Sequence, residues 1–216
     1  MTANMTLNNV LIIGDSYCTF EGYIPEGYAV YYSGNYRPET DVRKVTETWW
    51  HQVMRETGSN LVLNNSWSGS TIGYTGYENS DCSATSSFIY RFKQLVAHGF
   101  FKENKIDTLI IFGGTNDSWC EAPLGTLKFS DWKEEEFYSV LPAVTYFLEL
   151  VRKELPDTRI ICIINTELKP EIAEALRLAS ERNRIQAIEL HDITKDFGHP
   201  TIQGMKDIYE QVIAAL

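Results

Sequence analysis

The chain has 216 residues, of which 44% are hydrophobic and 22% charged, and its formal net charge is −10. These values are typical of a globular protein, and the length is typical of one domain. The acidic balance argues against nucleic acid or an anionic membrane as a partner, because both attract Lys and Arg.

Short apolar runs alternate with amphipathic helical patterns along the chain. Strands are predicted over 9–14, 60–66, 106–114, 158–165 and 185–193. Helices are predicted over 47–58, 86–99, 134–155 and 169–183, and a loop over 198–216 is predicted to run into a last helix. Gly99 is predicted as a helix C-cap, and Pro142 is predicted to kink or divide its helix. The alternation predicts an α/β fold of three layers, with a parallel sheet covered on both faces.

Residues 20–48 do not follow this alternation. The segment carries five tyrosines, shows no clear period and leaves the carboxyl end of the first predicted strand. Long irregular insertions in compact domains are often binding loops or lids, and sites of α/β proteins form at that end of a sheet. The segment is therefore expected to contribute to a substrate site, the alternative being a surface excursion packed on its own tyrosines.

Polar motifs follow the first three predicted strands, and a fourth motif precedes the last helix. They are GDS at 14–16, NNSWSGST at 64–71, GGTND at 113–117 and DFGHP at 196–200. A parallel sheet brings such loops to one edge, so residues far apart in the sequence are expected to meet there.

These motifs, in this order and spacing, resemble the SGNH hydrolases, also called the GDSL esterase/lipase family. The resemblance implies that Ser16 is the nucleophile, that His199 is the general base and later acid, and that Asp196 orients the imidazole. It also implies an oxyanion hole made by the backbone N–H of Ser16 with Gly69 and Asn116. The implied fold is a flavodoxin-like five-stranded parallel sheet in the order 2-1-3-4-5, within one domain over residues 1–216 that includes the tyrosine-rich insertion.

The residue types suit this chemistry. A serine hydroxyl is a weak nucleophile until a base takes its proton, and histidine has an ordinary pKa near 6.5. A carboxylate on the other ring nitrogen would fix the tautomer, and N–H donors would stabilise a tetrahedral oxyanion. Asp15 is expected to bond N–H groups at its turn.

Simpler interpretations exist for single residues. Ser16 alone could cap a helix. His191 beside Asp192 is a rival base, although the loop of His199 fits the family pattern better. Cys18 is expected to pack rather than react.

Two departures from the family pattern concern the substrate pocket. Tyr17 stands where a leucine often follows GDS, and Trp67 stands where small or aliphatic residues are common. Both residues are predicted to line the pocket.

The sequence therefore predicts a serine esterase that removes a short acyl group, acetyl in particular, from a polar alcohol such as a carbohydrate. A thioesterase or acyltransferase using the same site, and a non-catalytic carbohydrate-binding module, are the alternatives. No organic cofactor and no metal are implied: the four cysteines lie far apart without a CxxC pair, which argues against a zinc site or disulfide framework. No oligomeric state is predicted.

Localisation is expected to be cytoplasmic by default. No apolar segment approaches the roughly 20 residues of a membrane span. The stretch MTANMTLNN lacks the basic and apolar regions of a signal peptide, although a chain trimmed of its signal would look the same.

Overall fold

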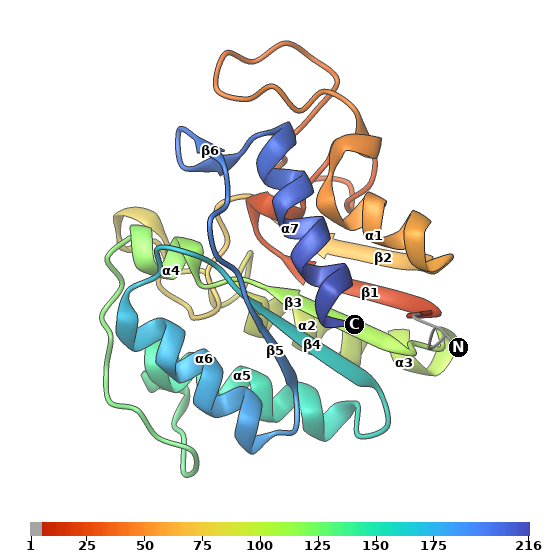
Figure 1. Ribbon diagram of the computed structural model, residues 1–216. Coiled ribbons are helices and arrows are strands. Elements are labelled where there is room, and N and C mark those ends of the chain that lie inside the picture. Colours follow the sequence, from red (N-terminus) through yellow and green to blue (C-terminus); the bar gives the residue numbers. More distant parts are fainter. Residues whose placement is uncertain (1–5) are drawn as a thin grey trace.

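A five-stranded parallel sheet forms the centre of the molecule in the computed structural model, which describes residues 6–216 (Figure 1). Its order is β2-β1-β3-β4-β5, which confirms the predicted topology. The strands are β1 (Asn9–Gly14), β2 (Asn60–Ser66), β3 (Thr108–Phe112), β4 (Arg159–Ile164) and β5 (Gln186–Glu189). The order reverses at β1, which lies between β2 and β3, and ligand sites of such sheets form at that point.

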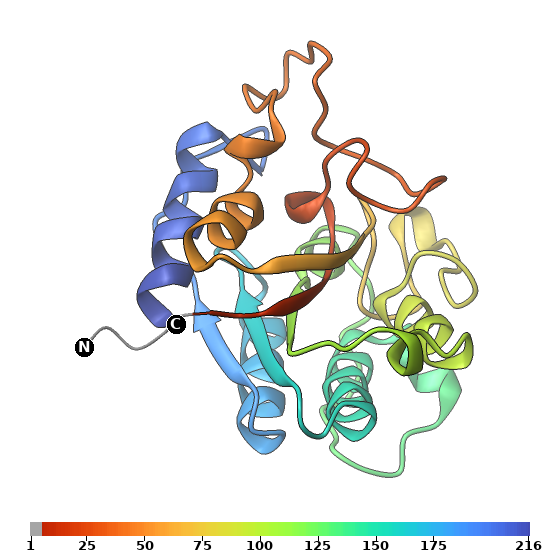
Figure 2. The ribbon, with the colours of Figure 1, turned by 90° about the vertical axis from the view of Figure 1, so that its right-hand side faces the viewer.

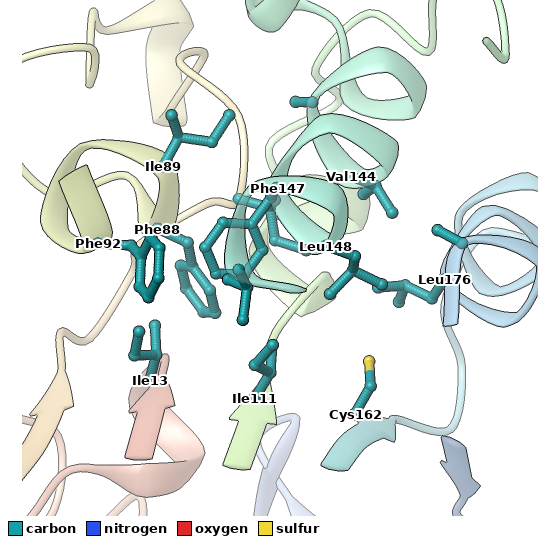
Figure 3. Close-up of a cluster of buried hydrophobic side chains, with 14 of the residues drawn as sticks. Ile13, Phe88, Ile89, Phe92, Ile111, Val144, Phe147, Leu148, Cys162 and Leu176 are labelled. Carbon is teal, nitrogen blue, oxygen red and sulfur yellow. The ribbon is translucent and has the colours of Figure 1, made fainter. Parts of the chain in front are cut away.

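Side chains of successive strand residues enter two separate cores, because they alternate between the faces of the sheet. Ile13 and Ile111 pack among α2 (Phe88–Ala97), α5 (Val140–Glu154) and α6 (Pro170–Arg182) (Figure 3). Ile12 and Ile110 pack against α1 (Trp49–Thr57) and α7 (Ile202–Ala215). All four isoleucines are fully buried, which explains why the strands read as continuous apolar runs. The predicted three-layer α/β fold is therefore confirmed.

The α-helices cover the two faces of the sheet (Figure 1). They are α1 (Trp49–Thr57), α2 (Phe88–Ala97), α3 (Phe100–Glu103), α4 (Thr115–Trp119), α5 (Val140–Glu154), α6 (Pro170–Arg182) and α7 (Ile202–Ala215). Short 3-10 helices span Ser16–Cys18, Val45–Glu47, Tyr77–Asn79 and Glu134–Tyr138.

The segment predicted as one helix over 134–155 is divided, but the break lies before Pro142 rather than at it. A 3-10 helix ends at Tyr138, Ser139 adopts an extended backbone, and α5 begins at Val140. Pro142 therefore lies in the first turn of α5, where its missing N–H has no helical partner to lose.

Two other boundaries differ from the sequence prediction. The C-cap of α2 is His98, and Gly99 follows it in the left-handed conformation with φ 74°, immediately before α3. The fifth strand is shorter than predicted and ends at Glu189. Asp192, with φ 50°, turns the chain away from the extended conformation beyond it.

The segment after the first 3-10 helix has neither helix nor strand from Thr19 to Lys44. It rises beyond α1 and α7 in Figure 1 and crosses toward the loop after β2 in Figure 2. The N–H of Ser68 donates to the carbonyl of Ala29 at 2.9 Å, and the hydroxyl of Tyr32 donates to the carbonyl of Pro200 at 3.0 Å. The insertion is thus tied to the two loops that flank the carboxyl edge of the sheet.

None of the helices described between residues 6 and 216 combines the length and apolar character needed to cross a membrane. Residues 1–5, which form part of the stretch used to predict the absence of a signal peptide, lie outside the described residues.

Candidate active site

Ser16 follows directly from the end of β1. Asp15 rather than Ser16 caps the short helix, because its carboxylate accepts the N–H of Tyr17 at 3.0 Å. This contact confirms the structural role expected of Asp15. The Ser16 side chain is not used as a cap, and the residue is 2% exposed. Its hydroxyl oxygen lies 3.0 Å from Nε2 of His199, so residues 183 positions apart meet at the edge of the sheet.

His199 lies on a hairpin formed by β6 (Lys195–Asp196) and β7 (His199–Pro200). The two turn residues, Phe197 and Gly198, have φ values of 44° and 75°, the positive pair that a tight type I′ turn requires. Nδ1 of His199 lies 3.2 Å from the carbonyl oxygen of Phe197. Burial lowers the pKa of His199, which favours the neutral imidazole that a base needs.

The structure does not bring the carboxylate of Asp196 to His199, contrary to the sequence-based expectation. Asp196 is exposed, and within residues 6–216 the group facing Nδ1 is the Phe197 carbonyl. Asp196 and His199 are opposite one another in the hairpin ladder, and the turn between them directs a main-chain oxygen to the ring. The Phe197 main chain, and not the Asp196 carboxylate, is thus the hydrogen-bond partner at Nδ1, and an orienting role of Asp196 stays a prediction.

The two other predicted oxyanion donors are Gly69, on the loop after β2, and Asn116, in α4, and the two segments are bonded to each other. Nδ2 of Asn116 donates one hydrogen to the carbonyl of Ser70 at 2.9 Å, which leaves its second hydrogen for a ligand. Gly69 has φ 81°, a conformation that favours glycine, and a β-carbon added there would have no described atom within 4 Å. Open space therefore lies beside this glycine.

The two residues predicted to line a substrate pocket lie in different environments. Tyr17 is fully buried, and its hydroxyl donates to the carbonyl of Gly198 at 2.5 Å. It therefore contacts the histidine hairpin and has no exposed surface, and its predicted place in a substrate pocket stays a prediction. Trp67 does line a pocket of about 460 Å³ and packs on Tyr28 with ring centroids 4.4 Å apart.

Two buried charged residues hold the site together, and the sequence analysis assigned neither a role. Arg91 is 1% exposed. Its guanidinium donates to the Asn65 main chain, to the carbonyl of Gly14 at 3.1 Å and to the hydroxyl of Ser70 at 3.1 Å. Burial lowers the pKa of Arg91 to about 10, so it stays charged at neutral pH. The signal in the sequence that could have revealed this role was a charged residue on the apolar face of α2, three residues after Phe88.

Asp117 is the second of these residues. Its carboxylate accepts the N–H groups of Ile72 at 3.0 Å and Gly73 at 3.3 Å, and burial raises its pKa to about 6. These bonds tie the loop after β2 to α4, the helix that carries Asn116. The GGTND motif contained this aspartate, but the motif alone did not separate its role from that of the asparagine.

The other histidine considered as the base lies elsewhere, and the cysteine near Ser16 is unsuited as a nucleophile. The side chain of His191 is 74% exposed and lies 3.2 Å from the carboxylate of Asp192. Cys18 is fully buried, and burial raises the pKa of its thiol well above the ordinary value, so the reactive thiolate is disfavoured. Across residues 6–216, no cluster of three His, Cys, Asp or Glu side chains is arranged to hold a metal ion.

Comparison with known proteins shows the family of the chain. Residues 8–216 match the sequence model of the GDSL-like lipase/acylhydrolase family. The chain belongs to this family. It is accordingly a hydrolase that acts on ester bonds.

Solved structures of similar proteins give the same fold. A protein from Bacteroides ovatus described as a GDSL-like lipase is 40% identical, with a TM-score of 0.88 over 97% of each chain. One from Bacteroides uniformis with the same description has the same identity and TM-score over 97% of this chain and 95% of that one. An acetyl xylan esterase from Butyrivibrio proteoclasticus shares the fold at 16% identity and a TM-score of 0.60, over 97% of this chain and 63% of its own. No curated protein sequence matches the chain.

Proposed function

We propose that the protein hydrolyses a short-chain acyl ester, in particular an acetyl ester, of a polar alcohol such as a carbohydrate. Ser16 is the nucleophile and His199 the base. The observation that carries the proposal is the contact of 3.0 Å between Ser16 Oγ and His199 Nε2. It lies within the hydrogen-bond reach that proton transfer requires.

The first half of the reaction forms an acyl-enzyme. Nε2 of His199 takes the proton of the Ser16 hydroxyl while Oγ attacks the ester carbonyl carbon, whose π electrons move to the oxygen. The backbone N–H of Ser16, the N–H of Gly69 and the free Nδ2 hydrogen of Asn116 stabilise this oxyanion. When the intermediate collapses, the C–O bond to the alcohol breaks and His199 gives its proton to the departing oxygen.

The second half releases the acid. His199 takes a proton from water, the resulting hydroxide attacks the acyl carbon, and the bond to Ser16 Oγ breaks. The proton on His199 then returns to Oγ, so one water is consumed and the enzyme is regenerated. The imidazolium formed in each half donates its Nδ1–H to the Phe197 carbonyl, and this bond favours the charged ring.

A small acyl group suits the space around Ser16. The nucleophile is 2% exposed, and the ring of Trp119 lies with its centroid 5.6 Å from that of His199. Ser16 does not line the pocket of about 460 Å³ beside Trp67. The aromatic pair of Tyr28 and Trp67 provides a surface for the apolar face of a sugar ring.

A fluorophosphonate probe tests the nucleophile. We expect it to label Ser16 in the folded protein and to leave Ser16→Ala unlabelled, with kcat of that variant lowered by on the order of 10⁵-fold or more. Labelling of another residue, or activity retained in Ser16→Ala, would contradict the proposal.

A substrate screen tests the finer assignment. Acetylated sugars, p-nitrophenyl esters of rising chain length and acyl-CoA are compared, with Ser16→Ala as the control. We expect the highest kcat/KM for acetyl esters. Preference for acyl-CoA would make the protein a thioesterase, and transfer of the acyl group to an added alcohol would make it an acyltransferase. Binding of sugars without hydrolysis of any ester would leave the binding-module alternative.

A further inference from the structure

One face of the His199 imidazole is covered by an aromatic ring from the tyrosine-rich insertion. The ring of Tyr31 lies parallel to it, with centroids 3.6 Å apart and an angle of 6° between the planes. Trp119 approaches the imidazole edge-on, at a centroid distance of 5.6 Å and an angle of 68°. Tyr31 is therefore the side chain that contacts a whole face of the predicted base.

Tyr31 is itself held by two neighbours. Nη1 of Arg37 donates to its carbonyl at 2.6 Å, and the Arg37 guanidinium carbon lies 4.8 Å from the centre of its ring. The N–H of Tyr31 donates to Oγ1 of Thr19 at 3.0 Å, and that hydroxyl donates to the carbonyl of Ser16 at 3.0 Å. The residue stacked on the base is thus linked through one threonine to the main chain of the nucleophile.

The contacts at the edge of the imidazole do not cover its faces, so the face contact with Tyr31 has a separate role. Nε2 contacts Ser16, and Nδ1 faces a main-chain oxygen on a hairpin whose tip residue, Phe197, is 72% exposed. Both contacts lie at ring nitrogens, and neither covers a ring face. A flat ring packed at 3.6 Å resists tilting of the imidazole out of the line between Ser16 and Phe197.

We propose that Tyr31 is a positioning residue for His199, acting through its stacked ring to keep Nε2 directed at the Ser16 hydroxyl. This inference rests on the proposed serine-esterase function and extends it to the insertion. The phenol hydroxyl has no part in the role, because its described bond, to the carbonyl of Glu39, is 3.4 Å long.

Charged groups surround this stack on several sides. Arg37 from the insertion and Lys195 from β6 lower the pKa of His199, in addition to the larger effect of burial. Glu39 and Asp196 act on the Tyr31 side of the stack, where both raise the pKa of its phenol. Removing the Tyr31 ring would expose the imidazole to water and so raise its pKa toward the ordinary value.

The experiment compares Tyr31→Phe, Tyr31→Leu and Tyr31→Ala with the wild-type protein. Tyr36→Ala is the matched control, since Tyr36 belongs to the same insertion but is 83% exposed. Three quantities are measured: kcat and KM with p-nitrophenyl acetate, the second-order rate constant for fluorophosphonate labelling of Ser16, and the pH dependence of kcat/KM. Circular dichroism melting reports folding.

We expect Tyr31→Phe and Tyr36→Ala to stay within about twofold of wild type in every quantity. Tyr31→Leu and Tyr31→Ala should lower kcat and the labelling rate constant by about tenfold or more, with little change in KM, because misplacing a reacting group by about 1 Å can cost on the order of 100-fold. The acid limb of kcat/KM should move to higher pH in Tyr31→Ala.

Wild-type rates in Tyr31→Leu, or in Tyr31→Ala if it folds, would overturn the inference, as would an equal loss in Tyr31→Phe. A change confined to KM would also overturn it, because it would make Tyr31 a substrate contact. Wild-type protein that the probe does not label at Ser16 would instead refute the proposed function, so the two failures are distinguishable.

Discussion

The serine side and the histidine side of the site are held by different kinds of interaction. Ser16, Gly69 and Asn116 follow strands of the sheet, and buried charged groups hydrogen-bond their loops to one another. His199 lies on a hairpin with a two-residue turn, outside the sheet, where a main-chain oxygen and the stacked ring of Tyr31 contact it. Because of this difference, we expect substitutions on the serine side to affect stability and transition-state binding. Substitutions on the histidine side should instead affect the orientation and the pKa of the His199 ring.

The largest effect in this comparison is expected from Asn116→Ala. If Nδ2 stabilises the oxyanion, kcat should fall by about 10²–10³-fold while KM changes little. Steady-state kinetics with an acetyl ester measure both. Tyr77→Phe is the control, because it removes the hydroxyl that donates to Asn116 Oδ1 at 2.8 Å and leaves the amide in place. A loss seen mainly in KM would contradict the oxyanion role.

Arg91→Met should give the largest loss of stability. The variant leaves buried acceptors without a donor, including the carbonyl of Gly14, and should lower the free energy of unfolding by about 3 kcal/mol. Urea denaturation with fitted m-values measures this. Arg37→Met, the matched change on the histidine side, should alter the free energy by less than about 0.5 kcal/mol. Equal effects of the two arginines would remove the distinction between the sides.

Asp196→Asn should have a smaller effect on catalysis than the same change in a standard triad. Losing the orienting carboxylate of a serine protease lowers kcat by about 10⁴-fold. Here the Phe197 carbonyl faces Nδ1, so we expect a loss within about tenfold. Single-turnover kinetics with p-nitrophenyl acetate would test it. A loss approaching 10⁴-fold would restore Asp196 as the orienting residue.

The smallest effect is expected on the pH profile of Arg37→Met. The positive charge of Arg37 disfavours the imidazolium and so lowers the pKa of His199. Without it, the pKa should rise, and the acid limb of kcat/KM should move to higher pH because the neutral base is lost sooner on acidification. The profile of Lys195→Met, which removes the other nearby cation, should shift in the same direction. A shift to lower pH in either variant would contradict this account of the histidine side.

The sheet was predicted from the apolar runs of the sequence, and the contact between Ser16 and His199 from the family resemblance of its motifs. Apolar runs such as residues 9–14 can be buried on both faces only in a covered parallel sheet, and that sheet collects its carboxyl-end loops at one edge. That edge brings the loops after β1, β2 and β3 together, whereas the contact of 3.0 Å between Ser16 and His199 was anticipated from the resemblance of the four motifs to the SGNH hydrolases.

Other features depend on geometry that no motif specifies. The Phe197 carbonyl rather than the Asp196 carboxylate faces the ring because of positive φ angles in a two-residue turn, and the sequence does not determine which oxygen that turn directs at the ring. Tyr17 is adjacent to the nucleophile but packs beneath the hairpin, where its hydroxyl satisfies Gly198. Tyr31 was one of five tyrosines in an aperiodic segment, and nothing in the local pattern distinguished the one that stacks on His199.

The order of site residues along the chain has a consequence for biosynthesis. His199 is translated after all five strands of the sheet, whereas Ser16, Gly69 and Asn116 are all translated before β4. A nascent polypeptide that has left the ribosome as far as β5 contains the nucleophile and the anion donors but no base between them. If His199 is the base, as we propose, ester hydrolysis therefore requires that the hairpin has been synthesised and that α7 has packed beside α1.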